Sequence, residues 1–179
     1  TGGTEAAKEI VKNSSNNFAA TNLELGGKSP LIVFEDADIE SAANGIIAGN
    51  FGASGQSCVA GSRVIVQKNI ASKLIDIIKL KSQKIVVGDP VNAKTNLGPL
   101  CTKKQIELIE ETINKSTSQG GSIIFGGKKI EIDGNYFEPT LIHCPNKNIE
   151  TLNIEMFGPV ISMIEFDDEE QAIELANDS

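Results

Sequence analysis

Tryptophan is absent from this sequence of 179 residues, and histidine occurs only once, as His143. One histidine excludes a metal site built from several histidines, and a hydrolase with a Cys–His pair would have to use His143. Cysteine occurs three times at irregular spacing, which fits neither a disulfide framework nor a zinc site. We therefore expect no metal and a reducing compartment, namely the cytoplasm.

Long apolar runs and an excess of basic residues are missing as well. No run approaches the roughly 20 apolar residues that span a bilayer. The formal net charge is −8, from 16 Lys and Arg against 24 Asp and Glu. Phosphate backbones are bound by clustered Lys and Arg, so neither a nucleic acid nor a membrane is expected as a partner. The hydrophobic content of 40% is ordinary for a globular domain of this length.

Strand and helix patterns alternate along the chain, which favours an α/β fold with a mostly parallel sheet. Short apolar runs between turn residues predict strands, whereas apolar residues spaced three or four apart predict helices. Residues 18–25 are expected to be extended. The expected strands are 30–34, 63–67, 122–125, 136–143 and 159–166, and the expected helices are 5–13, 39–50, 71–84, one after position 102 and one after position 167.

Polar residues that cap helices mark several of these helix starts. Thr4 is the expected cap of the first helix, and either Asp36 or Asp38 caps the second. Thr102 is followed three residues later by Gln105, which forms a capping box for the fourth helix. Asp167 is expected to open the last helix.

Cys58 stands out by its surroundings. It follows Gly-Ala-Ser-Gly-Gln-Ser at 52–57 and precedes Val-Ala-Gly, so small residues leave space for an incoming carbonyl compound. A thiol that acts as a nucleophile needs such access and a nearby base. A lone cysteine is more often a small buried hydrophobic residue, and Cys101 and Cys144 are expected to be structural.

Glu24 is the candidate base. It follows an extended segment and precedes the Gly26-Gly27 pair, which places a carboxylate at a flexible corner of the chain. A glutamate at the end of a strand is otherwise more often a surface residue or one half of an ion pair. The pairing of Glu24 with Cys58 indicates covalent chemistry on an aldehyde or acyl group.

Three longer motifs occur in order along the chain. Residues 23–30 read Leu-Glu-Leu-Gly-Gly-Lys-Ser-Pro, residues 52–63 contain Gly-Gln-Ser-Cys and Ala-Gly-Ser-Arg, and residues 155–160 read Glu-Met-Phe-Gly-Pro-Val. Together they resemble the aldehyde dehydrogenase superfamily closely, at family-like spacing and over nearly the whole chain. Weaker similarity lies at 87–90, 97–100 and 136–141.

The resemblance implies an oxidoreductase that converts an aldehyde to a carboxylic acid with NAD or NADP as cofactor. The Cys58 thiolate would attack the aldehyde carbonyl, and the backbone N–H of Cys58 would donate to the oxyanion. Hydride transfer to NAD(P)+ would leave a thioester, which a water molecule activated by Glu24 would hydrolyse. The catalytic residues implied are therefore Cys58 and Glu24.

Five further residues match positions that bind the cofactor in this family. Glu155 corresponds to the residue that holds the nicotinamide ribose hydroxyls, and Phe157 corresponds to one near the nicotinamide. Leu25 corresponds to a position whose backbone lies beside the nicotinamide amide. Gly2 and Gly3 match the turn that opens a helix beside the pyrophosphate, although Gly3 stands where a serine is common.

The same resemblance implies a three-layer fold in which helices flank a mostly parallel sheet, truncated at both ends. Residues 1–24 would be the tail end of the dinucleotide-binding domain, and residues 25–179 an incomplete catalytic domain. The full-length protein is expected to be a homo-oligomer, either a dimer or a tetramer, while the isolated piece is expected to be inactive as a dehydrogenase. The alternatives are a CoA-acylating relative, in which CoA resolves the thioester, and a non-catalytic fragment with weak thiol esterase activity.

Overall fold

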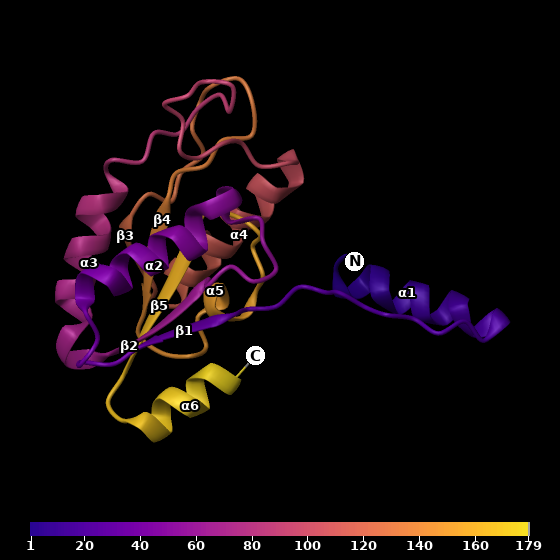
Figure 1. Cartoon of the computed structure of the whole chain (residues 1–179), viewed down its shortest axis with the longest axis horizontal. Helices are drawn as coiled ribbons and strands as arrows, with labels where there is room; N and C mark the ends of the chain where they lie inside the picture. Colours follow the sequence, from indigo (N-terminus) through magenta and orange to yellow (C-terminus); the bar gives the residue numbers. More distant parts are fainter. Residues whose placement is uncertain (179) are drawn as a thin grey trace.

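The computed structural model describes residues 1–178, and its centre is a five-stranded sheet (Figure 1). Four neighbouring strands run parallel, and the fifth, at one edge, is antiparallel to its neighbour. A mostly parallel sheet, as predicted, is thereby confirmed. In spatial order the strands are β1 (Pro30–Val33), β2 (Arg63–Gln67), β5 (Val160–Phe166), β4 (Thr140–Cys144) and β3 (Ser122–Phe125).

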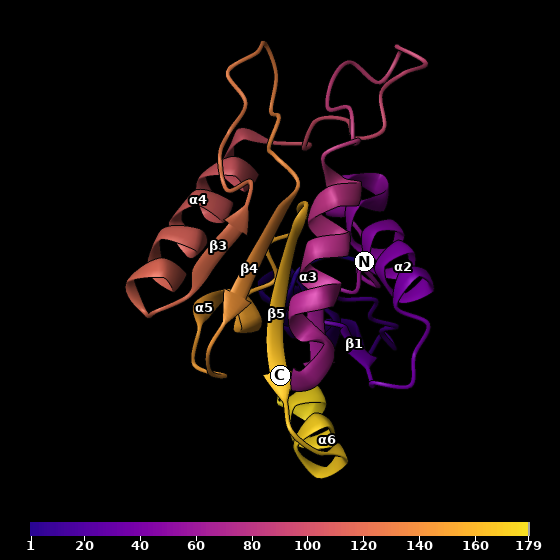
Figure 2. The same ribbon diagram turned by 90° about the vertical axis from the view of Figure 1, so that its left-hand side faces the viewer.

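Helices cover both faces of the sheet, which confirms the three-layer architecture (Figure 2). On one face lie α2 (Ile39–Phe51) and α3 (Lys68–Ser82). On the other face lie α4 (Lys103–Ser118), α5 (Glu150–Asn153) and α6 (Glu169–Asn177). None of the helices described is both long and apolar enough to cross a membrane.

The central strands are apolar on both sides because both sides are covered. In β2, Val64 and Val66 pack with α2 and α3, whereas Ile65 packs against the opposite layer. Leu141 and Ile142 of β4 divide between the two layers in the same way. Continuous apolar runs in the sequence therefore mark strands that are buried between two helical layers.

The N-terminal segment lies apart from these layers. Helix α1 (Thr4–Ser14) projects away from the sheet (Figure 1), and a short 3-10 turn (Ser15–Asn17) ends it. The segment is joined to the rest by a single parallel bridge, in which the Gly2 N–H donates to the Glu24 carbonyl at 3.1 Å. This bridge brings the glycines that open α1 next to the corner that carries Glu24.

Several local expectations are confirmed. Strands β2 and β3 have the predicted bounds, and Asp38, not Asp36, caps α2 by accepting from the Ser41 N–H at 2.7 Å. The Thr102 hydroxyl accepts from the Gln105 N–H at 3.3 Å at the start of α4, whereas the Gln105 side chain donates to the Met156 carbonyl, so the Thr102 half of the capping box is confirmed. These features depend on residues close in sequence, so the local pattern is sufficient to predict them.

Other local expectations are wrong. The first helix is capped by Gly3, since Thr4 already has a helical conformation, and the last is capped by Asp168, which accepts from Gln171. The strand expected at 136–143 begins only at Thr140, because Pro139 has no N–H for the ladder. Of residues 18–25, expected to be extended, Phe18 is left-handed with φ 57° and Leu25 makes one bridge, while the rest belong to no helix or strand. Helix α5 was not predicted.

Arg63, the first residue of β2, connects two distant segments. Its guanidinium, 3% exposed, donates from Nε to the Lys28 carbonyl at 2.6 Å and from Nη1 and Nη2 to the Leu175 and Ala176 carbonyls, both at 2.9 Å. A cation at the C-terminal end of α6 is favourable because unpaired carbonyls gather there. Burial lowers the pKa of Arg63, and nearby Asp178 acts in the opposite direction.

We predict that Arg63→Met lowers the free energy of unfolding by about 2–4 kcal/mol, because it leaves buried carbonyls without donors. Urea denaturation measures the loss. Lys68→Met is the matched control: its ion pair with Asp167, at 3.8 Å, is exposed, and its removal is expected to cost about 0.5 kcal/mol or less. Equal losses in the two variants would contradict the role assigned to Arg63.

Candidate active site

Three loops lead into three neighbouring parallel strands. Residues 24–29 precede β1, residues 52–62 precede β2 and residues 155–159 precede β5. The register aligns Pro30 with Arg63, and β2 pairs with β5 in the same direction. Because parallel strands begin at the same edge of a sheet, the three motifs found in the sequence meet at that edge.

A cleft of about 580 Å³ opens where these loops meet. Its size is in the range of pockets that hold a small molecule or a cofactor. The structure brings together on this cleft all seven residues predicted for the site: Gly2, Gly3, Glu24, Leu25, Cys58, Glu155 and Phe157. Gln56, Gln105 and Leu108 also line it, and nothing in the sequence had singled them out for this position.

Cys58 is exposed on the cleft and lies in a turn after the 3-10 helix η2 (Gly52–Gly55). The backbone of η2 is unusual, because Ala53 and Ser54 have positive φ angles of 50° and 56° and Gly55 has φ 72°. A Cβ at Gly55 would overlap the Gly158 carbonyl of the loop before β5. Left-handed residues cost free energy and persist only where the surroundings enforce them.

Hydrogen bonds from neighbouring segments hold this loop in its left-handed conformation. Ser54 donates to the Gly98 carbonyl at 3.0 Å, and Gln56 accepts from the Cys101 N–H at 2.9 Å. On the other side, the Ser29 hydroxyl donates to the Cys58 carbonyl at 3.5 Å, which ties the thiol loop to the Glu24 loop. The segment at 97–101 therefore supports the thiol loop, although the sequence showed it only as a weak motif.

Glu24 is exposed at the wall of the cleft, with its backbone held by Gly2. A carboxylate there can accept a proton from a molecule in the cleft, and the thiol of Cys58 lines the same space. Cys101 is exposed outside the cleft lining, whereas Cys144 is buried in the core beneath α5. Burial raises the pKa of Cys144 to about 11, so that thiol stays protonated.

Glu155 also lines the cleft. Its Oε1 atom is buried and has no hydrogen-bond partner within residues 1–178. The carboxylate lies against Gly26, where an added Cβ would displace it. Phe157 follows with a positive φ of 50°, and Gln105 donates to the Met156 carbonyl of the same loop. A buried acceptor without a donor marks a place for a hydroxyl-bearing ligand.

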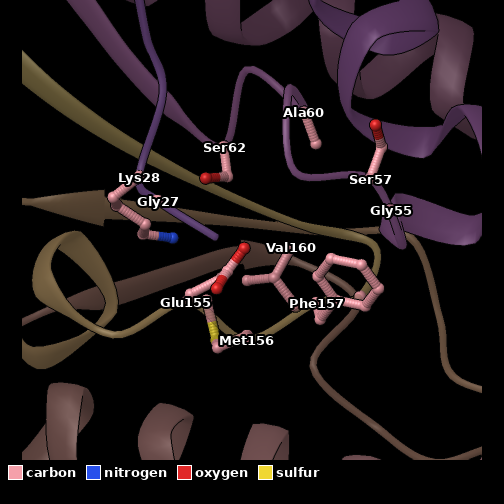
Figure 3. A pocket seen from close by; sticks show the side chains of 11 residues that line it. Gly27, Lys28, Gly55, Ser57, Ala60, Ser62, Glu155, Met156, Phe157 and Val160 are labelled. Carbon is pink, nitrogen blue, oxygen red and sulfur yellow. The ribbon is translucent and has the colours of Figure 1, made fainter. Parts of the chain in front are cut away.

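Lys28 is a site residue that sequence reasoning missed, although it lies within a recognised motif. It is 6% exposed and points into the interior beside Glu155 (Figure 3). Burial lowers its pKa to about 7, with Arg63 acting in the same direction and Cys144 and Glu155 opposing. No group of three or more potential metal ligands occurs within the part of the chain that the structure describes.

Comparison with known proteins gives one consistent family. The aldehyde dehydrogenase family is matched over residues 1–179. The (Z)-2-((N-methylformamido)methylene)-5-hydroxybutyrolactone dehydrogenase of Acinetobacter baylyi is 45% identical over 178 residues, which cover 99% of this chain and 36% of that protein. The betaine aldehyde dehydrogenase of Agrobacterium fabrum is 37% identical over 180 residues, with 99% and 36% covered.

Solved structures of aldehyde dehydrogenases are also similar to this chain. The crystal structure of betaine aldehyde dehydrogenase from Staphylococcus aureus in complex with NAD+ is similar at a TM-score of 0.95 and 38% identity, over 99% of this chain and 36% of that one. The aldehyde dehydrogenase of Bacillus cereus, an E194S mutant, has a TM-score of 0.96 at 35% identity. The chain thus spans about 36% of the length of these relatives.

We predict that Gly55→Ala lowers the free energy of unfolding by about 2–4 kcal/mol, because the new Cβ meets backbone atoms of Gly158 at a left-handed position. Gly52→Ala is the control in the same loop, since nothing lies within 4 Å of its added Cβ. We expect that control to stay within about 1 kcal/mol of the parent. Thermal unfolding of both variants checks the prediction, and a stable Gly55→Ala chain would refute the contact.

Proposed function

Because the chain belongs to the aldehyde dehydrogenase family, we propose that the protein carrying it oxidises an aldehyde to a carboxylic acid with NAD(P)+. The observation that supports this proposal most strongly is the shared cleft: the Cys58 thiol and the Glu24 and Glu155 side chains line one space. Since the chain spans about 36% of its relatives, the activity is proposed for the protein in which these residues are joined to the rest of the fold.

Cys58 supplies the nucleophile. Its Sγ, as the thiolate, forms a bond to the aldehyde carbon, and the carbonyl oxygen becomes an oxyanion that accepts from the backbone N–H of Cys58. When bound, NAD(P)+ supplies a hydride acceptor, so that the carbon attached to Sγ is oxidised to the thioester level. The loop before Cys58 contains left-handed residues, and the Ser29 hydroxyl bonds the Cys58 carbonyl. These features hold the thiol at the cleft while the bonds form.

Glu24 completes the reaction. Its carboxylate removes a proton from water, the water oxygen bonds to the thioester carbon, and the C–S bond breaks. The products are the carboxylic acid and the Cys58 thiolate, while the proton held by Glu24 returns to solvent. The exposure of Glu24 on the cleft gives water access to it.

The remaining residues of the cleft suit the cofactor. The Glu155 carboxylate can accept from a ribose hydroxyl, and the absence of a side chain at Gly26 leaves room for that carboxylate. Gly2 and Gly3 lie at the start of α1, where a helix N-terminus favours a phosphate. Phe157 and the backbone of Leu25 lie at the nicotinamide end.

Compartment and assembly belong to the same proposal. Three free cysteines support a reducing compartment, and we assign the protein to the cytoplasm. We also propose a homo-oligomer, by similarity to the family.

In the intact enzyme, Glu24→Gln is expected to retain one rapid equivalent of NAD(P)H per site, while steady-state turnover falls by roughly 10²–10⁴-fold. Cys58→Ser is expected to lose the burst as well, because no thioester forms. Stopped-flow absorbance of NAD(P)H measures both. Loss of the burst in Glu24→Gln would remove Glu24 as the hydrolytic base. Turnover that requires CoA and yields an acyl-CoA would favour the CoA-acylating alternative.

Thiol reactivity offers a test without cofactor. With iodoacetamide at pH 8, Cys58 is expected to react first and Cys144 only on unfolding, because Cys144 is buried and its pKa of about 11 leaves on the order of 0.1% thiolate. Mass spectrometry of the labelled peptides gives the order. A Cys58 that reacts no faster than exposed Cys101 would weaken its role as nucleophile.

A further inference from the structure

Two buried polar groups of opposite charge remain unpaired near the cleft. Lys28 Nζ and Glu155 Oε1 are both inaccessible to solvent, and neither has a hydrogen-bond partner within the described part of the chain. Leaving such a group unpaired in the interior costs free energy. A lysine that only filled space would be replaced at lower cost by methionine or leucine, so Lys28 needs another explanation.

Both groups line one small inner cavity of about 10 Å³. That volume is about the minimum that admits one water molecule. Figure 3 shows the Lys28 side chain pointing toward the Glu155 carboxylate, with Ser62 close to Lys28 and Ser57 farther away beside Gly55. Glu155, Ser57 and Phe157 line both this inner cavity and the large cleft, so Glu155 lies between the two.

The charged groups around Lys28 come from three elements. Arg63 at the start of β2 repels the ammonium, whereas Glu155 before β5 and Cys144 at the end of β4 attract it in their ionised forms. Cys144 is protonated at neutral pH because burial raises its pKa to about 11. Glu155 is therefore the group that can balance a charge on Lys28.

We propose that Lys28 is a positioning residue for Glu155, and that one water bridging the two groups orients the carboxylate toward the cleft. The expected effect of Lys28 on cofactor binding rests on the proposed function, since Glu155 is the residue we assign to the ribose hydroxyls. Lys28 itself lines the inner cavity and not the large cleft, so it touches neither substrate nor cofactor. It lowers the mobility of the carboxylate before the ribose arrives, which favours binding through preorganisation.

The pairing is tested by NMR titration of the 179-residue chain with ¹³C-labelled lysine, the Lys28 signal being assigned by its loss in Lys28→Met. In the parent we expect a midpoint near 7, far below the other lysines. Glu155→Gln removes the balancing charge and is expected to lower that midpoint. Glu24→Gln, which changes an exposed carboxylate outside the inner cavity, should leave it unchanged. An identical midpoint in Glu155→Gln and the parent would overturn the pairing.

The positioning role is tested in the intact enzyme. Lys28→Met leaves the buried Glu155 carboxylate without its balancing cation, and we expect it to raise the KM for NAD(P)+ about tenfold with a smaller change in kcat. Lys73→Met, on the exposed face of α3, is the control and should alter neither. An unchanged KM, or a fall in kcat as large as the rise in KM, would overturn the positioning role. An inactive parent enzyme would refute the proposed function alone, because the NMR titration still decides the pairing.

Discussion

Parallel pairing of β1, β2 and β5 is the constraint on which the rest of the site depends. Each of the three motifs ends where one of these strands begins, so the pairing register decides which motif residues meet. Open parallel sheets commonly bind ligands at the carboxyl ends of their strands. Here the candidate site lies at the amino ends, because the sequence places its thiol and both carboxylates in the loops that enter the strands.

Arg63 links this edge of the sheet to helix α6. Its guanidinium holds the Lys28 carbonyl on one side and the last carbonyls of α6 on the other, so the Glu24 loop and α6 share one anchor. The Ser29–Cys58 hydrogen bond adds a second link between neighbouring loops. Side chains outside the cleft lining thus hold in place the two loops that carry Glu24 and Cys58.

Features that cost stability gather around the cleft. Ala53 and Ser54 adopt left-handed backbone, Glu155 keeps a buried oxygen without a donor, and Lys28 is a buried cation with a lowered pKa. Natural proteins concentrate such local conflicts at functional sites and offset them by packing elsewhere. In this chain the free-energy cost is offset by the packing of two apolar layers, which enclose the central strands on both faces.

The amino-acid sequence by itself determined the α/β class, the bounds of β2 and β3, the cap of α4, and a set of seven site residues that line one cleft. Those features follow from neighbouring residues or from short motifs of consecutive residues. The catalytic and binding roles remain predictions. Only the tertiary structure decided that α5 forms, that Gln56 is held by the 97–101 segment, and that Lys28 is buried beside Glu155. The physical reason is that burial and long-range hydrogen bonds depend on segments that can lie more than a hundred residues away, which no local pattern contains.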